Sequence, residues 1–193
     1  MSSSVTVSGS PAHGRRGLRP KLIAVIAAAV VIGAVAAAVL VATGDDEKGK
    51  LTGSGGNNFS LSYPDGWKEL SAKELGDSPG SPIAGVRSGD GSGFVFVRRE
   101  GRAPKNFDAF STQFTRELDA RLPDFQKRSA RIVKTAGGNA FFYSYIRKKK
   151  GTVHTVVVVP DGNRSYALNT VSKGGEEKTA REVANIILSF KAN

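Results

Sequence analysis

The sequence of 193 residues contains no cysteine, and this absence excludes several kinds of chemistry. Without thiols there is no disulfide, no cysteine nucleophile and no cysteine-ligated metal site. A lipoprotein anchor is excluded as well, because lipid attachment behind a signal peptide needs a cysteine. Any folded domain must therefore depend on its apolar core, even in an oxidising compartment.

Histidine is nearly absent too, with His13 close to the amino terminus and His154 much further along the chain. A zinc site has no second nearby histidine to complete it. A Ser-His-Asp arrangement around His154 is not supported by any nucleophile-elbow sequence, so we interpret His154 as an ordinary strand residue. The sequence therefore predicts no enzyme, no metal site and no cofactor.

Charge and proline are both missing from residues 22–42. As a helix this apolar run is about 31 Å long, which matches the hydrocarbon core of a bilayer. Basic residues precede it and acidic residues follow it, which predicts a cytoplasmic amino terminus and an external carboxy-terminal domain. A cleaved signal peptide is the alternative, with 36–38 as its small-residue cleavage site, but the run is longer than signal-peptide cores. We favour an uncleaved, single-pass anchor in the cytoplasmic membrane, which makes the lipid bilayer one partner.

The rest of the chain divides around this span. Residues 1–21 are rich in Ser, Gly and basic residues and are expected to form a disordered cytoplasmic tail. Residues 43–57 hold five glycines among acids, Lys and Ser, which predicts a flexible linker. Residues 58–193 are long enough for one extracytoplasmic domain with its own core.

Hydrophobic periodicity predicts an α+β domain. Alternation at 59–63 indicates a half-buried strand before a Pro64-Asp65-Gly66 turn and Trp67, one or two helical turns are expected within 68–75, and short strands at 83–87 and 94–98. Aromatic residues at three- and four-residue steps predict a helix over 106–122, and a second amphipathic helix is predicted over 176–191. Between them, turn residues separate four strands at 130–135, 140–147, 152–159 and 164–171, of which the third, apolar on both faces, should be central. This order predicts an α/β/α layered domain with a central antiparallel sheet flanked by helices.

The strand and turn at 59–67, the aromatic helix, the meander and the closing helix together resemble the PsbP-like family, in particular actinobacterial envelope members of the LpqN type. The resemblance covers about 135 residues and implies a compact antiparallel sheet between helices. It also implies an accessory or binding role rather than catalysis. The chain departs from the lipoprotein members because it has an apolar span and no lipid-bearing cysteine.

Basic residues are in excess, with a formal charge of +11 for the whole chain. Two clusters form a candidate anion-binding or partner surface: a predicted hairpin tip with Arg147, Lys148, Lys149 and Lys150, and a second group with Arg98, Arg99 and Arg102. Lysine-rich turns also keep sheet edges soluble, and we favour that simpler interpretation. Nucleic acid is not expected as a partner of a domain outside the cytoplasm.

These features favour a non-catalytic, membrane-tethered binding or accessory module of the cell envelope. Its partner is left open between an envelope protein, an anionic lipid and a wall polymer, and the sequence does not decide the oligomeric state. An envelope hydrolase with an unrecognised site, and docking to anionic lipid or wall polymer through the basic turns, remain as alternatives.

Overall fold

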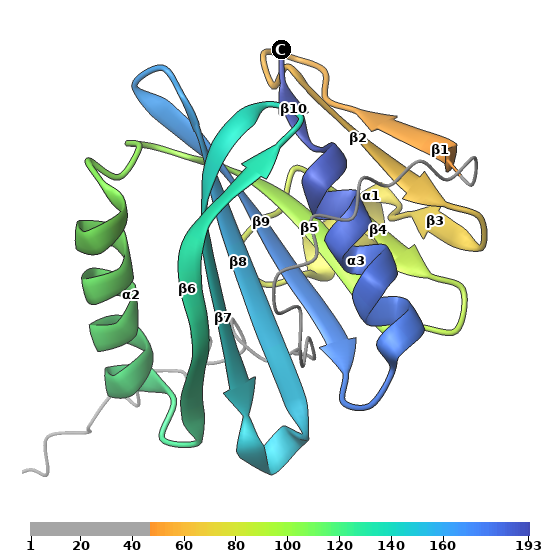
Figure 1. Ribbon diagram of the computed structural model, residues 1–193. Coiled ribbons are helices and arrows are strands. Elements are labelled where there is room, and N and C mark those ends of the chain that lie inside the picture. The colour runs from red at the N-terminus through yellow and green to blue at the C-terminus, as the bar shows by residue number, and fades with distance from the viewer. Residues whose placement is uncertain (1–46) are drawn as a thin grey trace, which may run out of the picture.

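The computed structural model describes residues 47–193, which form an α+β domain built on a seven-stranded antiparallel sheet (Figure 1). The strand order is β3-β4-β5-β9-β8-β7-β6, so that the late strands β8 and β9 lie between the early strand β5 and β7. The predicted tail, membrane span and first linker residues lie outside the described part of the chain. Within residues 47–193, none of the helices combines the length and apolar character needed to cross a bilayer.

The strands of this sheet are β3 (Trp67–Glu69), β4 (Ala84–Ser88), β5 (Gly93–Glu100), β6 (Phe125–Thr135), β7 (Gly138–Arg147), β8 (Thr152–Asp161) and β9 (Arg164–Lys173). A 3-10 turn, η1 (Lys148–Lys150), joins β7 to β8. Residues 153–159 of β8 are all buried, so the prediction that this strand lies inside the sheet and is covered on both faces is confirmed.

Helix α3 (Glu177–Ser189) covers one face of the sheet and closes the larger core. Val183, Ile186 and Ile187 are buried against β2, β5 and β9. The rings of Phe59, Tyr166 and Phe190 form a cluster at the end of this helix, with centroids 5.5–5.6 Å apart. Trp67 is buried in the same core, and its indole N–H donates to Glu182 of α3 at 2.9 Å.

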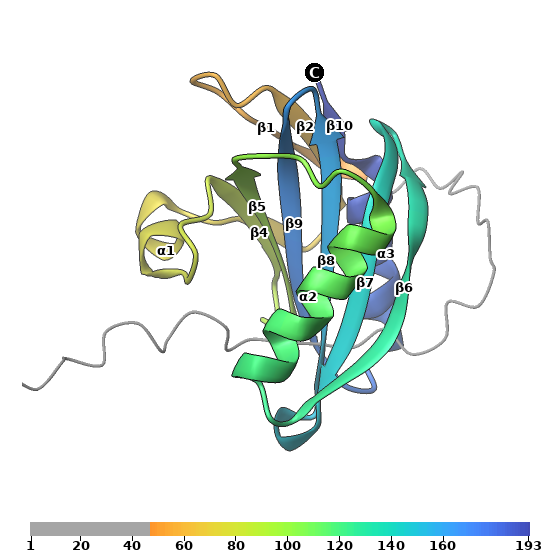
Figure 2. The ribbon, with the colours of Figure 1, turned by 90° about the vertical axis from the view of Figure 1, so that its left-hand side faces the viewer.

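Helix α2 (Phe107–Arg121) lies on the opposite face, over the β6–β7 side of the sheet (Figure 2). Its start is fixed by Asn106, whose side chain accepts a hydrogen bond from the Ala109 N–H at 2.8 Å. Phe110, Leu118 and Tyr143 form the second core beneath it. The predicted layering of helix, sheet and helix is therefore present, with one long helix on each face.

The predicted flexible linker needs a correction, because part of it is a strand. β1 (Glu47–Thr52) pairs with β2 (Phe59–Pro64) in a small second sheet, whose other edge strand is β10 (Lys191–Ala192). Leu51 enters the main core beside Phe59 and Leu61, and this burial orders the segment. The glycine-rich stretch 53–56 is the turn between the two strands, so the domain begins at or before residue 47.

The short helix α1 (Ala72–Asp77) begins later than the predicted 68–75. Ser71 caps it: the Ser71 hydroxyl accepts from the Glu74 N–H, and the Glu74 carboxylate accepts from the Ser71 N–H. Residues 67–69 instead pair with β4, because strand β3 carries the buried Trp67 into the sheet.

Candidate functional site

A groove of about 830 Å³ lies between α2 and the exposed part of the sheet, on the face opposite α3. Its floor is formed by β9 and β8, and strand β5 borders it on the side away from α2. Figure 2 shows that α2 runs diagonally across this face, from the β6–β7 side at its start across β8 at its end, while the small helix α1 lies well to the other side. On this face, no helix among residues 47–193 packs along the β5–β9 strip, which α3 covers only from the other side.

Strand register decides which side chains reach the groove. Along β9, Ala167, Asn169 and Val171 line it, whereas Tyr166 and Leu168 between them belong to the core beneath α3. The three groove residues pair with Val158, Val156 and His154 of β8 on one side and with Arg98, Phe96 and Phe94 of β5 on the other. Cross-strand pairs share a face, so three parallel rows of side chains cross the floor.

Aromatic rings form the sides of the groove. Phe110 and Phe114 of α2 stack at 5.5 Å and meet the ring of Tyr143 edge-on. On the opposite side, Phe96 stacks on Phe94 at 5.9 Å with nearly parallel rings. Gly85 of β4 pairs with Phe96, and a Cβ at that position would lie 3.3 Å from the ring, so the glycine gives the ring room on the sheet.

Three polar atoms of the groove residues are buried without any hydrogen-bond partner among residues 47–193: His154 Nε2, Ser165 Oγ and Asn169 Nδ2. His154 is 5% exposed and Ser165 is 1% exposed. A buried polar group without a partner costs about 1–3 kcal/mol, so three in one groove make a substantial destabilisation. Such groups are typical of sites where another molecule supplies the missing bonds.

His154 is held as a neutral ring. Its imidazole stacks flat on Tyr145, with centroids 4.4 Å apart. Burial is the main reason why the pKa of His154 falls to about 3; the nearby charges of Arg147 and Lys150 also lower it, and the Asp124 carboxylate opposes them. At neutral pH this end of the groove therefore offers a neutral imidazole rather than a positive charge.

The rim of the groove is charged and mostly positive. Four cations, Arg98, Arg102, Lys105 and Arg121, stand against two acids, Glu100 and Glu117. Arg98 is paired with Glu100 at 3.2 Å, whereas no ion pair within residues 47–193 involves the other three cations. A groove with unpaired cations at its rim attracts negative charge.

The structure separates the two predicted basic clusters. Arg147, Lys148, Lys149 and Lys150 lie at the turn between β7 and β8, whereas Arg98, Arg99 and Arg102 lie at the opposite end of the sheet, near the β8–β9 turn. The two groups therefore do not form one continuous surface.

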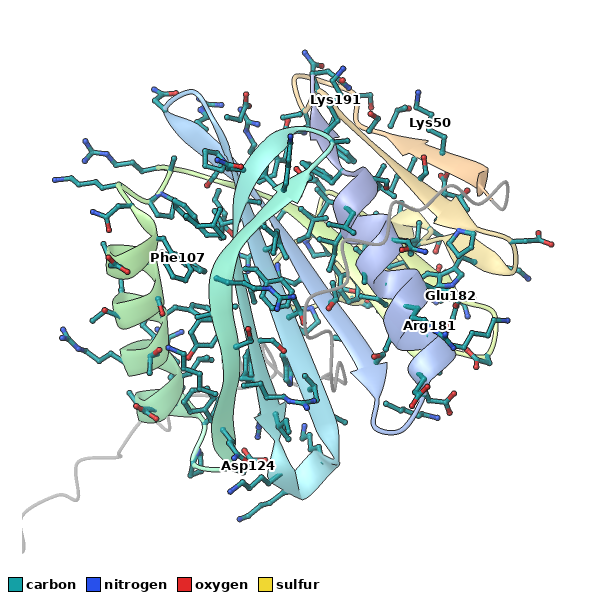
Figure 3. All side chains as sticks on the ribbon, viewed as in Figure 1. Lys50, Phe107, Asp124, Arg181, Glu182 and Lys191 are labelled. Carbon is teal, nitrogen blue, oxygen red and sulfur yellow. The ribbon has the colours of Figure 1, made fainter. Side chains whose placement is uncertain are left out.

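Within the first cluster, Arg147 differs from the three lysines. Its guanidinium forms a buried ion pair with Asp124, which is 4% exposed at its side chain and lies at the base of the turn (Figure 3). The Lys149 N–H donates to the same carboxylate, and the Lys148 N–H donates to the Asp124 carbonyl. Burial raises the pKa of Asp124, but the bond and charge of Arg147 and the Lys149 N–H outweigh it and lower the pKa overall. Lys148, Lys149 and Lys150 remain exposed.

Within the second cluster, neighbouring residues point to opposite faces of β5. Arg98 and Arg102 line the groove. Arg99 faces the other side, where it bonds to Asp161 at 2.6 Å and lies over the Tyr166 ring at 4.2 Å. The groove itself was not predicted from the sequence. One signal for it was present, because the strand 94–97 carries apolar residues on both faces, which indicates that both faces are covered.

Within residues 47–193, no cluster of three or more His, Cys, Asp or Glu side chains is placed to hold a metal ion. His154 and Ser165 both line the groove but lie at its two ends. Ser165 pairs with Pro160 of β8, six residues after His154, which separates them by about 20 Å. These two side chains therefore do not assemble into a nucleophile and base.

No family model matches the sequence, and no curated protein matches it. Solved structures do match its fold. The solution structure of the cyanobacterial PsbP (CyanoP) from Synechocystis sp. PCC 6803 is similar with a TM-score of 0.54 and 15% identity, over 79% of this chain and 96% of that one. The Ran-binding protein Mog1p of Saccharomyces cerevisiae is similar with a TM-score of 0.51 and 13% identity, over 75% and 94%. The domain therefore has the PsbP/Mog1 fold.

Proposed function

We propose that this protein is a non-catalytic binding module and that the groove between α2 and the sheet is its binding site. The observation that carries the proposal is the groove itself: an apolar floor and aromatic sides enclose three polar atoms that lack partners within residues 47–193. Binding sites are concave and mostly apolar with a few polar groups that fix orientation, and this groove has that composition.

The groove lacks the features that hydrolysis would use. Its histidine is neutral, stacked on Tyr145 and about 20 Å from the buried serine. A general base needs the proton it removes within hydrogen-bond reach and a pKa near the working pH, and the pKa of about 3 is far below that. This geometry favours the binding module over the alternative of an envelope hydrolase.

We place the module in the cell envelope, tethered to the outer face of the cytoplasmic membrane by residues 22–42 with the amino terminus inside. The apolar length and flanking charges of that stretch support this, and so does the likeness of the 59–67 motif to LpqN-type envelope proteins. In this proposal the helix takes the place of the lipid anchor, and the PsbP/Mog1 fold agrees with the resemblance.

A second role, docking to an anionic surface, is favoured by one observation at the β7–β8 turn. Lys148, Lys149 and Lys150 are exposed there, while Arg147 is neutralised by Asp124. Replacing the three lysines by glutamine should weaken binding to vesicles containing phosphatidylglycerol and flatten its salt dependence. Unchanged vesicle binding would remove this role and leave the groove as the binding site.

Photo-crosslinking tests the main proposal. Benzoylphenylalanine in place of Phe96 puts a reactive ketone in the groove, whereas the same residue in place of Leu188, which is 40% exposed on α3, samples the opposite face. In cells of the source organism, we expect a discrete adduct from position 96 and none of the same mass from position 188. Identical adducts from both positions, or none from position 96, would contradict the groove as the binding site.

A further inference from the structure

We propose that the occupant of the groove is an amphipathic, acidic α-helix of a protein partner. This rests on the proposed function, because it takes the groove as the binding site and names the kind of molecule that fills it. Four features of the described residues lead to it: the dimensions of the open strip, its apolar floor, the charges at its rim and the polar side chain at its centre.

The open strip has the size of one helix. Its floor runs along β9 from Ser165 to Val171, which is about 20 Å at the rise of a strand. Strands β5 and β8 border β9 on either side and lie about 10 Å apart, which is the diameter of an α-helix with its side chains. A helix of about 14 residues spans the same 20 Å.

Sheet packing explains why a helix would be stable there. The face beneath α3 is covered, but on the other face α2 covers only the β6–β7–β8 side. The remaining floor is the β9 row of Ala167, Asn169 and Val171, and Phe96 and Phe114 stand at its sides. Val156 and Val158 of β8 form its border with the core beneath α2. Layered α+β domains bury such a face beneath a second helix, and in this chain the described residues provide none for it.

Charge selects an acidic partner. Arg102 and Lys105 lie at the end of the groove near the β5–α2 loop, and Arg121 lies at the other end, where α2 finishes. These three rim cations have no ion pair within residues 47–193. Glutamates or aspartates on the exposed flanks of a bound helix would pair with them, and such rim charges direct association and suppress basic partners.

Asn169 adds a requirement at the centre of the helix face. Its Nδ2 is buried in the middle row of the floor, between Phe96 and Val156, without a partner among the described residues. A bound helix satisfies it with one oxygen-bearing side chain, such as Ser or Gln, in the middle of an otherwise apolar stripe. When an amphipathic helix binds in a groove, its anchor side chains recur at positions i, i+3, i+4 and i+7 of the bound helix.

A synthetic helix provides the probe. A fluorescent peptide of about 14 residues carries leucines on one stripe, a central serine within that stripe and glutamates elsewhere. Its fluorescence anisotropy is titrated with the full chain in phosphatidylcholine nanodiscs. Two matched peptides serve as controls: one has lysine in place of every glutamate, and the other has a central proline that breaks the helix.

Variants of the protein locate the binding. Ala109→Trp introduces a bulky ring at an exposed groove position on α2, whereas Thr112→Trp puts the same ring on an exposed position of α2 outside the groove. Arg102→Glu with Lys105→Glu reverses two rim charges. Lys148→Glu with Lys149→Glu makes the same change in net charge at the distant turn.

We expect the acidic peptide to bind, and each of the following to weaken it about tenfold or more: the lysine peptide, the proline peptide, Ala109→Trp and the rim reversal. Thr112→Trp and the distant reversal should change the affinity by less than about twofold. Affinity should also fall as salt is raised, since rim charges are screened.

Each of the following results would contradict the acidic helix as the occupant of the groove. Equal affinity for the lysine or proline peptide removes the acidic helix as the preferred ligand. Displacement of the peptide by vesicles of phosphatidylglycerol, with no such effect in Ala109→Trp, assigns the groove to lipid. Dimerisation of the full chain that Ala109→Trp abolishes assigns it to a second copy. If no peptide binds but position 96 still gives a specific adduct, the helix fails and the binding module stands; if neither is seen, both fail.

Discussion

Replacing Asn169 by leucine should make the domain more stable while impairing the groove. The side chain of Asn169 stands in the middle of the floor, and its Nδ2 is buried without a partner among residues 47–193. Phe96 and Val156 are its cross-strand neighbours on β5 and β8. Leucine is of similar size and adds apolar contact to both, so the substitution removes a penalty and gains packing.

The magnitude follows from the lost penalty. An unsatisfied buried donor costs about 1–3 kcal/mol, and its removal should raise the free energy of unfolding by about that amount. For a domain of this size each kcal/mol corresponds to roughly 2–4 °C in Tm. A gain of this kind at a binding surface is the usual relation between stability and function, in which a site retains polar groups that the fold alone would not select.

Urea denaturation followed by circular dichroism measures this effect, with Tm from calorimetry as a second reading. Asn139→Leu is the matched control, because Asn139 is an exposed strand residue on β7 and the same exchange there reports only local strand preference. A loss of stability in Asn169→Leu, or a gain no larger than in Asn139→Leu, would refute the reasoning, because it would mean that the fold itself satisfies the Asn169 amide.

Three further predictions concern other buried polar and charged groups of the domain. Ser165→Ala should leave the free energy of unfolding unchanged or raise it, because the buried hydroxyl has no partner among residues 47–193. Ser92→Ala should lower it by about 1–2 kcal/mol in urea denaturation, because that hydroxyl bonds to an aspartate and a threonine. Equal effects of the two substitutions would contradict this reasoning. The pKa of His154 falls from 6.5 to about 3 in the folded state, mainly through burial, so between these pH values only the unfolded state binds the extra proton. The free energy of unfolding should therefore be at its full value above pH 6.5 and fall by up to about 1.4 kcal/mol per pH unit below it. His154→Phe should flatten this slope, and an unchanged slope would show that another group causes it. Asp124→Asn should destabilise the domain by about 3 kcal/mol, because it removes the carboxylate of an ion pair whose side chains are 12% and 4% exposed. Asp161→Asn, at a more exposed pair, should cost less than about 1 kcal/mol. Similar losses would show that burial does not separate the two pairs.

The sequence predicted the elements whose periodicity is strong. The helix now seen at 107–121 was indicated by aromatic residues at helical spacing, and the four late strands by β-forming residues between turns. Burial on both faces of β8 followed from its run of valines. These features depend on residues that are close in the chain, so they can be predicted from the sequence alone.

Features that depend on distant pairing were missed. Nothing local in 47–52 distinguishes a strand from a flexible linker, because what orders this segment is pairing with β2 and burial of Leu51 in the core. The same applies to Lys148 and its neighbours, since the position of Arg147 depends on Asp124, which is far from it in the sequence. In the sequence, residues 147–150 are four equivalent cations, whereas in the structure only the three lysines are exposed.

The groove was not predicted from the sequence for a related reason. Its floor combines strands that are distant in the chain, because β9 pairs with both β5 and β8. The apolar stripe of α2 packs on the sheet through Phe110 and Leu118, but Ala109 and Gln113 on the same helix border the groove. Only the sheet order shows that α2 is too far to one side to cover β5 and β9.

The most direct test of the binding groove combines the crosslinker with the obstructing ring. Adduct yield from benzoylphenylalanine at position 96 is measured in cells in three backgrounds: the otherwise unchanged chain, Ala109→Trp, and Thr112→Trp, at matched protein levels. The account predicts that the adduct is retained with Thr112→Trp and lost with Ala109→Trp, because only the first leaves the groove open. An adduct of the same mass and yield in all three would contradict the claim that the groove holds the ligand.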